Sequence, residues 1–222
     1  MDIEQWMNDL VAALRKDFAG RLLFVGLQGS RRRGEATPES DIDAVVILDR
    51  VDVTDLRRYR AIVDSLPEAD KACGFIGGAK ELLHWPRYEL FQFRNDTRAY
   101  FGNLDEYLPE ITRQDIRDSI RFSAAALYHM AAHSCVHGRG EDGTADLRGA
   151  YKGTFFILLA KAYLEDGGYA EDKSALLDKL SGLDRDILDT AMRWDELEGE
   201  RRSEPDKFFD RLLTWSGELI SS

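Results

Sequence analysis

The stretch that most constrains this chain runs from Phe24 to Leu48, where two short apolar runs enclose a Gly-Ser turn and two aspartates. The first run contains Phe24 and Val25, and the second extends from Ala44 to Leu48. Both have the apolar, β-branched character of short buried strands bounded by turn residues. We therefore expect two strands of one sheet with a polar turn between them.

The turn and the aspartates have the chemistry of a phosphate and metal site. At Gly29-Ser30, the glycine allows a ligand to approach closely, and the backbone N–H groups and the hydroxyl can bind phosphate oxygens. Asp41 and Asp43 are separated by one residue, so on an extended segment both carboxylates point to the same side. Magnesium is usually held by one or two carboxylates together with substrate phosphates. A capped loop with two solvated aspartates is the alternative, but the two motifs together at this separation favour a functional site.

The same residues resemble a known signature. Gly29-Ser30, the segment Arg33-Gly34-Glu35-Ala36-Thr37 and the tetrapeptide Ser40-Asp41-Ile42-Asp43 are similar to the motif of the DNA polymerase beta-like nucleotidyltransferases. The small bacterial type, with minimal nucleotidyltransferases and aminoglycoside adenylyltransferases, is the nearest in pattern. The resemblance implies that Gly29 and Ser30 contact nucleotide phosphates and that Asp41 and Asp43 bind two Mg²⁺ ions. It also implies transfer of a nucleoside monophosphate, AMP from ATP or the equivalent from another nucleoside triphosphate, to a hydroxyl acceptor with release of pyrophosphate.

Relatives of this type usually carry a third carboxylate on the next strand, which we expect from Asp70 to Gly78. That group can act as a general base toward the acceptor hydroxyl and can touch a metal. The strand has no acid in its middle, so Asp70 at its start is the best match and joins Asp41 and Asp43 as a predicted catalytic and metal-binding residue. Asp70 could equally be a turn residue after Pro67. If no carboxylate serves, the chain binds nucleotide without transferring it. The other candidates are Glu68, Glu81 and Asp96.

Two groups of cations are candidates for the phosphates. Arg31-Arg32-Arg33 follows the Gly-Ser turn; such runs are usually solvated, but one member beside the turn can reach a triphosphate or an acceptor, and we assign Arg33 to the phosphate site. The region around Lys173 resembles the part of adenylyltransferases where a helix begins with a lysine directed at the nucleotide phosphates. Lys152, which we expect to be buried among apolar neighbours, is a second candidate. For each lysine the alternative is a solvated side chain.

Charge and composition narrow the class of protein. The chain of 222 residues has a formal net charge of −11, which argues against binding of long nucleic acids because such binding depends on neutralising many phosphates. No apolar run approaches the roughly 18 residues of a membrane span, and the acidic N-terminus does not resemble a signal peptide. We expect a cytoplasmic protein. Cys73 and Cys135 lack metal-finger spacing and are interpreted as reduced thiols.

The periodicity changes along the chain and predicts an α+β protein in two parts. Residues 1–111 are expected to form a nucleotidyltransferase-type mixed β-sheet with flanking helices, and residues 112–222 an all-helical bundle that closes the cleft. Trp85 and Tyr88 are expected in a loop. In the first part we expect helices over 3–18 and 52–66 and an edge strand over 97–102. In the second part we expect helices over 115–137, 147–164, 183–194 and 206–220, a helix beginning near Lys173, a loop over 141–146 and a charged linker over 196–204.

Three histidines, His129, His133 and His137, fall at i, i+4 and i+8 on one helix. Two histidines at that spacing can chelate zinc, but the glutamate of a His-Glu-x-x-His motif is missing. We favour a polar helix face on which a histidine binds a phosphate or an acceptor.

The acceptor remains open between a small molecule and a protein. An alternative function is a non-catalytic or antitoxin-like nucleotide-binding protein that regulates a separate protein partner. Extension of RNA ends is disfavoured by the acidic charge and by the lack of an evident basic groove.

Overall fold

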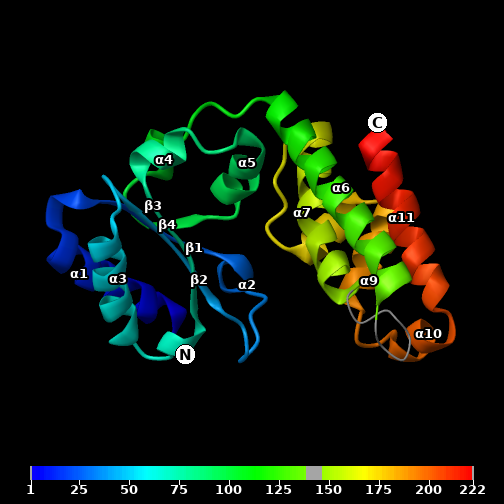
Figure 1. The fold of residues 1–222 in the computed structure, drawn as a ribbon, viewed down its shortest axis with the longest axis horizontal. Coiled ribbons are helices and arrows are strands. Elements are labelled where there is room, and N and C mark those ends of the chain that lie inside the picture. The colour runs from blue at the N-terminus through cyan, green and yellow to red at the C-terminus, as the bar shows by residue number, and fades with distance from the viewer. Residues whose placement is uncertain (1, 139–146, 222) are drawn as a thin grey trace. The chain divides into compact units, whose positions relative to one another are not determined.

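The computed structural model describes residues 2–138 and 147–221, which divide into two compact units, Met1–Ile111 and Thr112–Ser222 (Figure 1). The first unit contains a four-stranded mixed sheet with helices, and the second is all-helical in its described part. The α+β class expected from the sequence is confirmed. The expected loop over 141–146 lies outside the described residues.

The sheet has the strand order β3-β2-β1-β4. Strand β1 (Leu22–Gln28) runs antiparallel to both β2 (Ile42–Leu48) and β4 (Arg98–Phe101), and β2 runs parallel to β3 (Ala72–Gly78). Strand β1 therefore ends at the same edge of the sheet at which β2 and β3 begin. The turn that follows β1 and the aspartates at the start of β2 meet at this edge.

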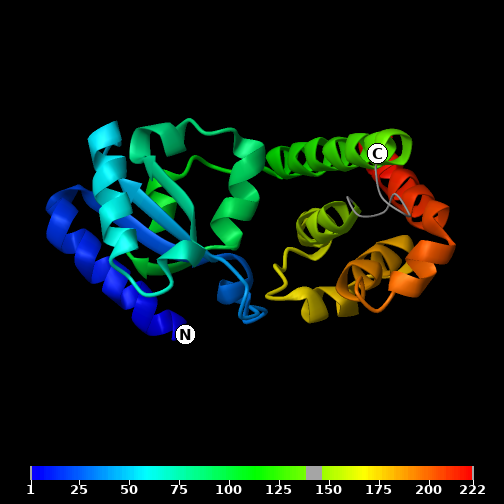
Figure 2. The ribbon, with the colours of Figure 1, turned by 60° about the horizontal axis from the view of Figure 1, so that its bottom comes forward.

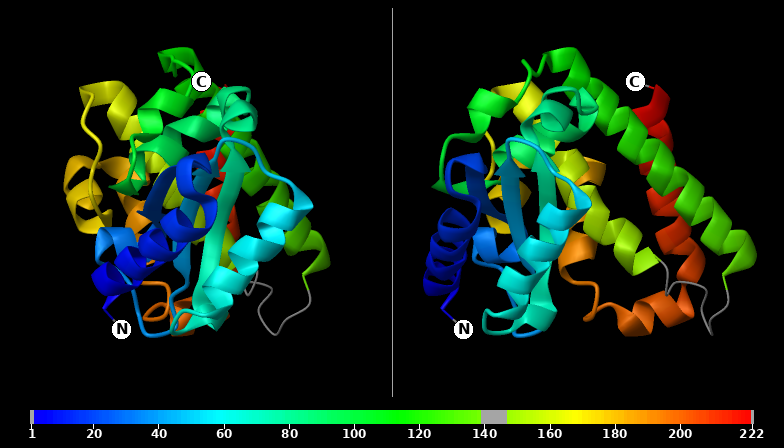
Figure 3. Two further views of the ribbon diagram at one scale, coloured as in Figure 1. Left: turned by 90° about the vertical axis from the view of Figure 1, so that its left-hand side faces the viewer. Right: turned by 60° about the vertical axis from the view of Figure 1, so that its left-hand side comes forward.

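Different helices cover the two faces of the sheet (Figures 2 and 3). Helices α1 (Ile3–Phe18) and α3 (Val53–Asp64) cover one face, and α4 (Ala79–Leu83) and α5 (Arg87–Asn95) cover the other. The short segments between them are η1 (Ala19–Arg21), α2 (Gly29–Arg33), η2 (Ala69–Lys71) and η3 (Leu104–Tyr107).

Alternation along β2 decides which face carries the aspartate within the strand. Ala44 and Val46 are buried in the core beneath α1 and α3, whereas Val45 and Ile47 belong to the core beneath α4 and α5. Because successive side chains point to opposite faces of a strand, Asp43 lies on the face covered by α5.

Helix α1 forms over the predicted residues because its apolar side chains recur with helical period. Trp6, Met7, Leu10 and Leu14 are all buried on one side. The side chain of Asp2 caps the N-terminus by accepting hydrogen bonds from the amides of residues 4 and 5.

The helical unit is built on a long helix, α6 (Arg113–His137), which packs against α7 (Leu147–Asp166) and α11 (Pro205–Ser221). The remaining helices are α8 (Lys173–Lys179), α9 (Gly182–Met192) and α10 (Glu198–Ser203). Helix α6 begins at a capping box in which Thr112 and Asp115 bind each other's backbone amides.

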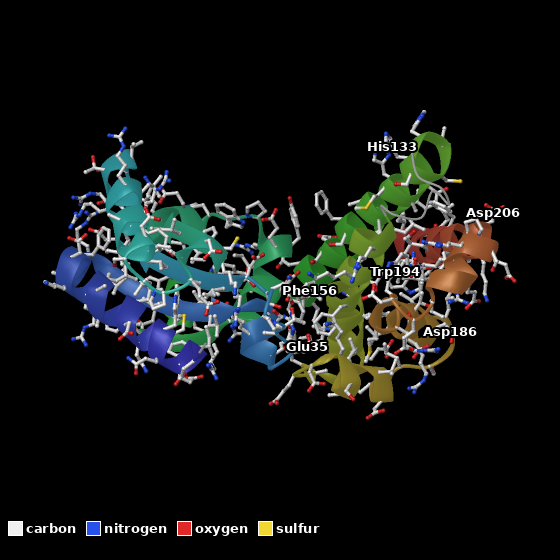
Figure 4. The ribbon with its side chains drawn as sticks, turned by 90° about the horizontal axis from the view of Figure 1, so that it is seen from below. Glu35, His133, Phe156, Asp186, Trp194 and Asp206 are labelled. Atoms are coloured by element: carbon white, nitrogen blue, oxygen red, sulfur yellow. The ribbon has the colours of Figure 1, made fainter. Side chains whose placement is uncertain are left out.

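Aromatic side chains fill the core of the helical unit. The Trp194 ring centroid lies 5.1 Å from that of Tyr151 and 6.1 Å from that of Phe208, and all three residues are buried. Figure 4 labels Trp194 within this unit. Trp215 and Leu212 are also buried in this unit.

Three local expectations were wrong. The charged segment after Trp194 contains α10, stabilised by an i,i+4 ion pair of 2.6 Å between Glu198 and Arg202. Tyr88 lies in α5 rather than in a loop. Lys152 is exposed. The buried positions of α7 include its neighbour Tyr151, whereas Lys152 lies on the side of the helix that faces solvent.

No helix in residues 2–138 and 147–221 combines the length and apolar character that crossing a membrane requires.

An ion pair between a buried aspartate of α3 and Arg21 connects α3 to the residue before β1. Asp55 is 2% exposed and accepts two hydrogen bonds of 2.8 Å from the Arg21 guanidinium. The hydrogen bond from Arg21 lowers the pKa of Asp55 to about 2, against the opposing effect of desolvation.

This depressed pKa predicts an acid-dependent loss of stability. The contribution of the pair is fully present above the pKa of an unfolded aspartate, about 3.9, and is lost as the pH falls toward about 2. Asp55→Asn should therefore be less stable than the parent at pH 7, and the difference should shrink between about pH 4 and pH 2. Urea denaturation across this range measures it. Asp64→Asn, which alters an exposed ion pair with Arg60, is the control; a difference between Asp55→Asn and the parent that stays constant with pH would contradict the assignment.

Candidate functional site

The turn after β1 is held against the first residues of β2. Gly29 has φ +72°, and a Cβ built there would lie 2.9 Å from Cγ of Asp43 and closer still to Oδ2. Asp43 stands opposite Gln28 in the antiparallel register. A side chain at position 29 would be strained by the backbone and would overlap this carboxylate. The glycine therefore permits the carboxylate of Asp43 to lie directly against the turn.

Asp41 lies just outside β2 and is exposed. Its position is fixed through the main chain, because Arg31 donates from Nε to the carbonyl of Asp41 at 2.9 Å and from Nη2 to the carbonyl of Ser40 at 2.6 Å. The segment that carries Asp41 is thus tied back to α2, the short helix that contains Ser30. Gly29, Ser30, Asp41 and Asp43 consequently gather at one edge of the sheet.

Arg33, which we expected at the phosphates, is engaged inside the unit. Its Nη1 lies 2.7 Å from each carboxylate oxygen of Asp96, and its Nε lies 3.2 Å from Glu35. The Arg33 side chain is 8% exposed. Hydrogen bonds to the two carboxylates raise the pKa of Arg33 although desolvation opposes the shift, so this guanidinium is firmly charged and committed to its acidic neighbours.

The four candidates for a third carboxylate occupy different places. Asp70 is exposed in η2, immediately before β3, at the same edge of the sheet as Asp41. Glu68 immediately precedes η2 and forms an ion pair with Lys71, which lowers the pKa of Glu68. Glu81 lies over Gly78 at the opposite end of β3. The fourth, Asp96, is buried beside Gly29, where it binds Arg33.

The donor set suits a cation that takes part of its coordination from a substrate. Among the described residues no three acidic, histidine or cysteine side chains form a group that could hold a metal ion, so Asp70 does not complete a preformed three-carboxylate cluster with Asp41 and Asp43. Magnesium is typically bound through one or two carboxylates and the oxygens of substrate phosphates. Asp41 and Asp43 beside the Gly29-Ser30 turn fit that requirement.

Lys173 belongs to the second unit and is the first residue of α8, whose N-cap is Asp172. The start of a helix at this lysine is confirmed. Its Nζ lies 5.6 Å from the centroid of the Phe155 ring. The assignment of Lys173 to a phosphate stays a prediction.

The remaining candidates lie on the surface. His129, His133 and His137 are exposed on α6, with ring centroids 6.1 and 4.9 Å apart, and Figure 4 shows His133 toward the end of that helix. In the part of the chain that the structure describes, they do not form a metal-binding group. Cys73 and Cys135 are free and exposed.

The sequence did not predict the hydrogen bonds that connect Gln28 and the Gly29-Ser30 turn to the end of α5 and the residues after it. Gln28 donates from its side chain to the carbonyl of Phe93 at 3.1 Å and to the hydroxyl of Thr97 at 2.7 Å. Asp96 accepts a hydrogen bond of 3.2 Å from the amide of Gly29. The motif residues gave no signal for these bonds, because the partners come from a segment more than sixty positions away.

The overlap at Gly29 can be tested with a matched glycine. Gly34 has φ +73° but open space around its would-be Cβ. Gly34→Ala should therefore cost only the left-handed backbone strain, about 1–2 kcal/mol, whereas Gly29→Ala should cost more because the carboxylate of Asp43 must move. In an Asp43→Ala background the cost of Gly29→Ala should fall to that of Gly34→Ala. Urea denaturation of the four variants gives these differences; equal costs for the two glycines in the parent would contradict the geometry.

Comparisons with known proteins identify a matching domain and a similar fold. Residues 8–96 match the family model of the nucleotidyltransferase domain. The fold is similar to the crystal structure of spectinomycin adenyltransferase AAD(9) from Enterococcus faecialis with ATP and spectinomycin, with a TM-score of 0.57 and 16% identity over 94% of this chain and 98% of that chain. No curated protein sequence matches the chain. The first unit thus contains a stretch, residues 8–96, that matches the nucleotidyltransferase domain, and the fold of the chain is similar to that of an adenyltransferase.

Proposed function

We propose that this protein is a magnesium-dependent nucleotidyltransferase that moves AMP from ATP to a hydroxyl group of an acceptor and releases pyrophosphate. The observation that carries the proposal is the contact of the Asp43 carboxylate with Gly29, which joins a carboxylate ligand to a phosphate-binding turn at one edge of the sheet. A loop with solvated aspartates would not require a glycine in the left-handed region packed against one of them.

Different residues of the first unit bind the phosphates and the metal ions in this proposal. Ser30 binds the phosphates and Gly29, whose amide donates to Asp96, lets them approach closely, since the turn lies at the edge at which β2 begins. Asp41 and Asp43 would hold two Mg²⁺ ions, which when bound supply charge neutralisation and activation of the acceptor oxygen. Arg31 keeps Asp41 in place through two main-chain carbonyls.

The cation for the departing pyrophosphate is Lys173 in this proposal. Arg33 was another candidate, but both oxygens of Asp96 and one of Glu35 bind its guanidinium, so a phosphate would have to displace a buried ion pair. Displacement of that kind is costly because it leaves a buried carboxylate without its charge partner. Arg33 therefore supports the phosphate site from behind, and Lys173 neutralises developing negative charge directly.

Asp70 is the proposed general base. It lies at the same edge of the sheet as Asp41 and is exposed, so an acceptor hydroxyl can reach it. Glu81 is unsuited because it lies at the far end of β3, and Asp96 is unsuited because Arg33 binds both of its oxygens.

The proposed acceptor is a small hydroxyl-bearing molecule. The structure that is similar over nearly the whole chain was determined with ATP and spectinomycin. A protein acceptor is the other outcome that the same phosphate chemistry permits. Incubation of the purified protein with magnesium and labelled nucleoside triphosphates, against aminoglycosides, other small hydroxyl compounds and cell lysate, separates the two by what becomes labelled.

A second candidate function is nucleotide binding without transfer, in a protein that regulates a partner. The observation in its favour is that Asp70 forms no three-carboxylate cluster with Asp41 and Asp43 in the described residues. ATP binding with no labelled product under any condition would favour this second function.

The aspartates provide the central test. Asp41→Asn and Asp43→Asn should each lower the rate of nucleotide transfer at least about a hundredfold, because removing one electrostatic stabiliser of a transition state has effects of that size. Thermal unfolding should remain cooperative in both variants, since Asp41 is exposed and Asp43 lies at the start of its strand. Asp64→Asn is the control for the loss of one surface carboxylate. Magnesium-dependent turnover retained in both Asp41→Asn and Asp43→Asn would overturn the proposed site.

Lysine replacement tests the contribution of the second unit. Lys173→Met should raise KM for ATP about tenfold, the effect of losing one charge-assisted hydrogen bond. Lys152→Met is a matched control because Lys152 is exposed on α7. Steady-state kinetics with varied ATP compares the two; an equal effect in both variants would remove Lys173 from the phosphate site.

A further inference from the structure

Asp96 is a buried carboxylate at the back of the Gly-Ser turn. It is the residue that follows α5, and it is 3% exposed. Its oxygens receive Nη1 of Arg33 at 2.7 Å each, and Nη1 of Arg32 lies 3.9 Å away. Buried aspartates are rare unless they are paired, and here the pairing draws two consecutive arginines toward the end of α5.

The same carboxylate also reaches the main chain of the turn. Oδ2 of Asp96 accepts a hydrogen bond of 3.2 Å from the amide of Gly29. Gly29 is also in contact with the carboxylate of Asp43. Two carboxylates therefore define where the first residue of the turn lies, one in the expected metal-binding motif and one outside it.

The end of α5 is itself fixed to the sheet. Gln28, the last residue of β1, donates to the carbonyl of Phe93 and to the hydroxyl of Thr97, on either side of Asp96 in the chain. Arg32 donates from Nη2 to the carbonyl of Asn95 at 3.3 Å. The Asp96 carboxylate, which accepts the hydrogen bond from the Gly29 amide, is thus held in place without a bound ligand.

We propose that Asp96 is a positioning residue for the phosphate-binding turn. It fixes the Gly29 amide and the Arg33 guanidinium so that Ser30 and Asp43 are in place to bind the nucleotide. Its effect on nucleotide binding rests on the proposed function, whereas its effect on the Gly29 amide does not. Asp96 is not the general base, because Arg33 binds both oxygens and the side chain is buried.

The experiment compares Asp96→Ala, which removes the acceptor, with Asp105→Ala. Asp105 forms an equally well-aligned pair with Arg94 of α5, at 2.6 and 2.9 Å, but both side chains are about half exposed and it does not contact the turn. In Asp96→Ala the hydrogen exchange of the Gly29 amide, measured by NMR without nucleotide, should accelerate about tenfold or more, and the Kd for ATP with magnesium should rise by a similar factor. Asp105→Ala should change neither.

A hydrophobic replacement separates positioning from general stability. Removing one partner of a buried pair is destabilising, whereas replacing both with apolar residues of similar volume is often neutral. The double variant Arg33→Met/Asp96→Leu should therefore recover the thermal midpoint of the parent yet keep the fast exchange at Gly29 and the weak ATP binding. It also serves if Asp96→Ala does not fold.

The outcomes distinguish the two proposals. Parent-like exchange at Gly29 in a folded Asp96→Ala or double variant would overturn the positioning role. Fast exchange at Gly29 together with parent-like ATP affinity would also overturn it, because the turn would then bind nucleotide without being held. Failure of the parent itself to bind ATP, with the exchange effect present, would count against the proposed function and leave the role of Asp96 in shaping the turn supported.

Discussion

The contact between Gly29 and the carboxylate of Asp43 is the constraint on which the arrangement of the first unit depends. It requires β1 and β2 to be antiparallel neighbours in the register that pairs Gln28 with Asp43, and it requires a residue without a side chain at the first position after β1. Because β2 also runs parallel to β3, the segment containing Asp70 arrives at the same edge. Residues distant in the chain thus gather around one glycine because of strand order and direction.

The sequence predicts correctly that the run Arg31-Arg32-Arg33 lies beside the turn, but it does not predict which groups the three arginines bind. From the sequence, one of three arginines beside a phosphate turn is expected to contact phosphate. In the structure Arg31 binds main-chain carbonyls next to Asp41, and Arg32 and Arg33 bind the end of α5. Guanidinium groups satisfy several acceptors at once in a fixed geometry, which suits them to bracing a turn from behind.

Much of the fold could be predicted because it follows from periodicity. Helix α1 has the predicted bounds, since Trp6, Leu10 and Leu14 mark one buried side, and the strands lie where apolar runs are bounded by turn residues. For Asp70 the sequence left two positions open, the start of the strand and a turn after Pro67, and the structure has it in η2 before β3. The placement of Asp96 behind Gly29 could not be predicted, because it depends on which distant segment the side chain meets and a local pattern carries no information on that.

The binding partners of the arginines determine how much positive charge the turn leaves for a triphosphate. A triphosphate brings several negative charges, and the first unit offers two carboxylates that require cations of their own. Arg33 is held by the carboxylates of Asp96 and Glu35, whereas Arg31 binds neutral main-chain carbonyls and keeps its positive charge beside the turn. In the proposed function, further neutralisation comes from magnesium held by Asp41 and Asp43 and from Lys173.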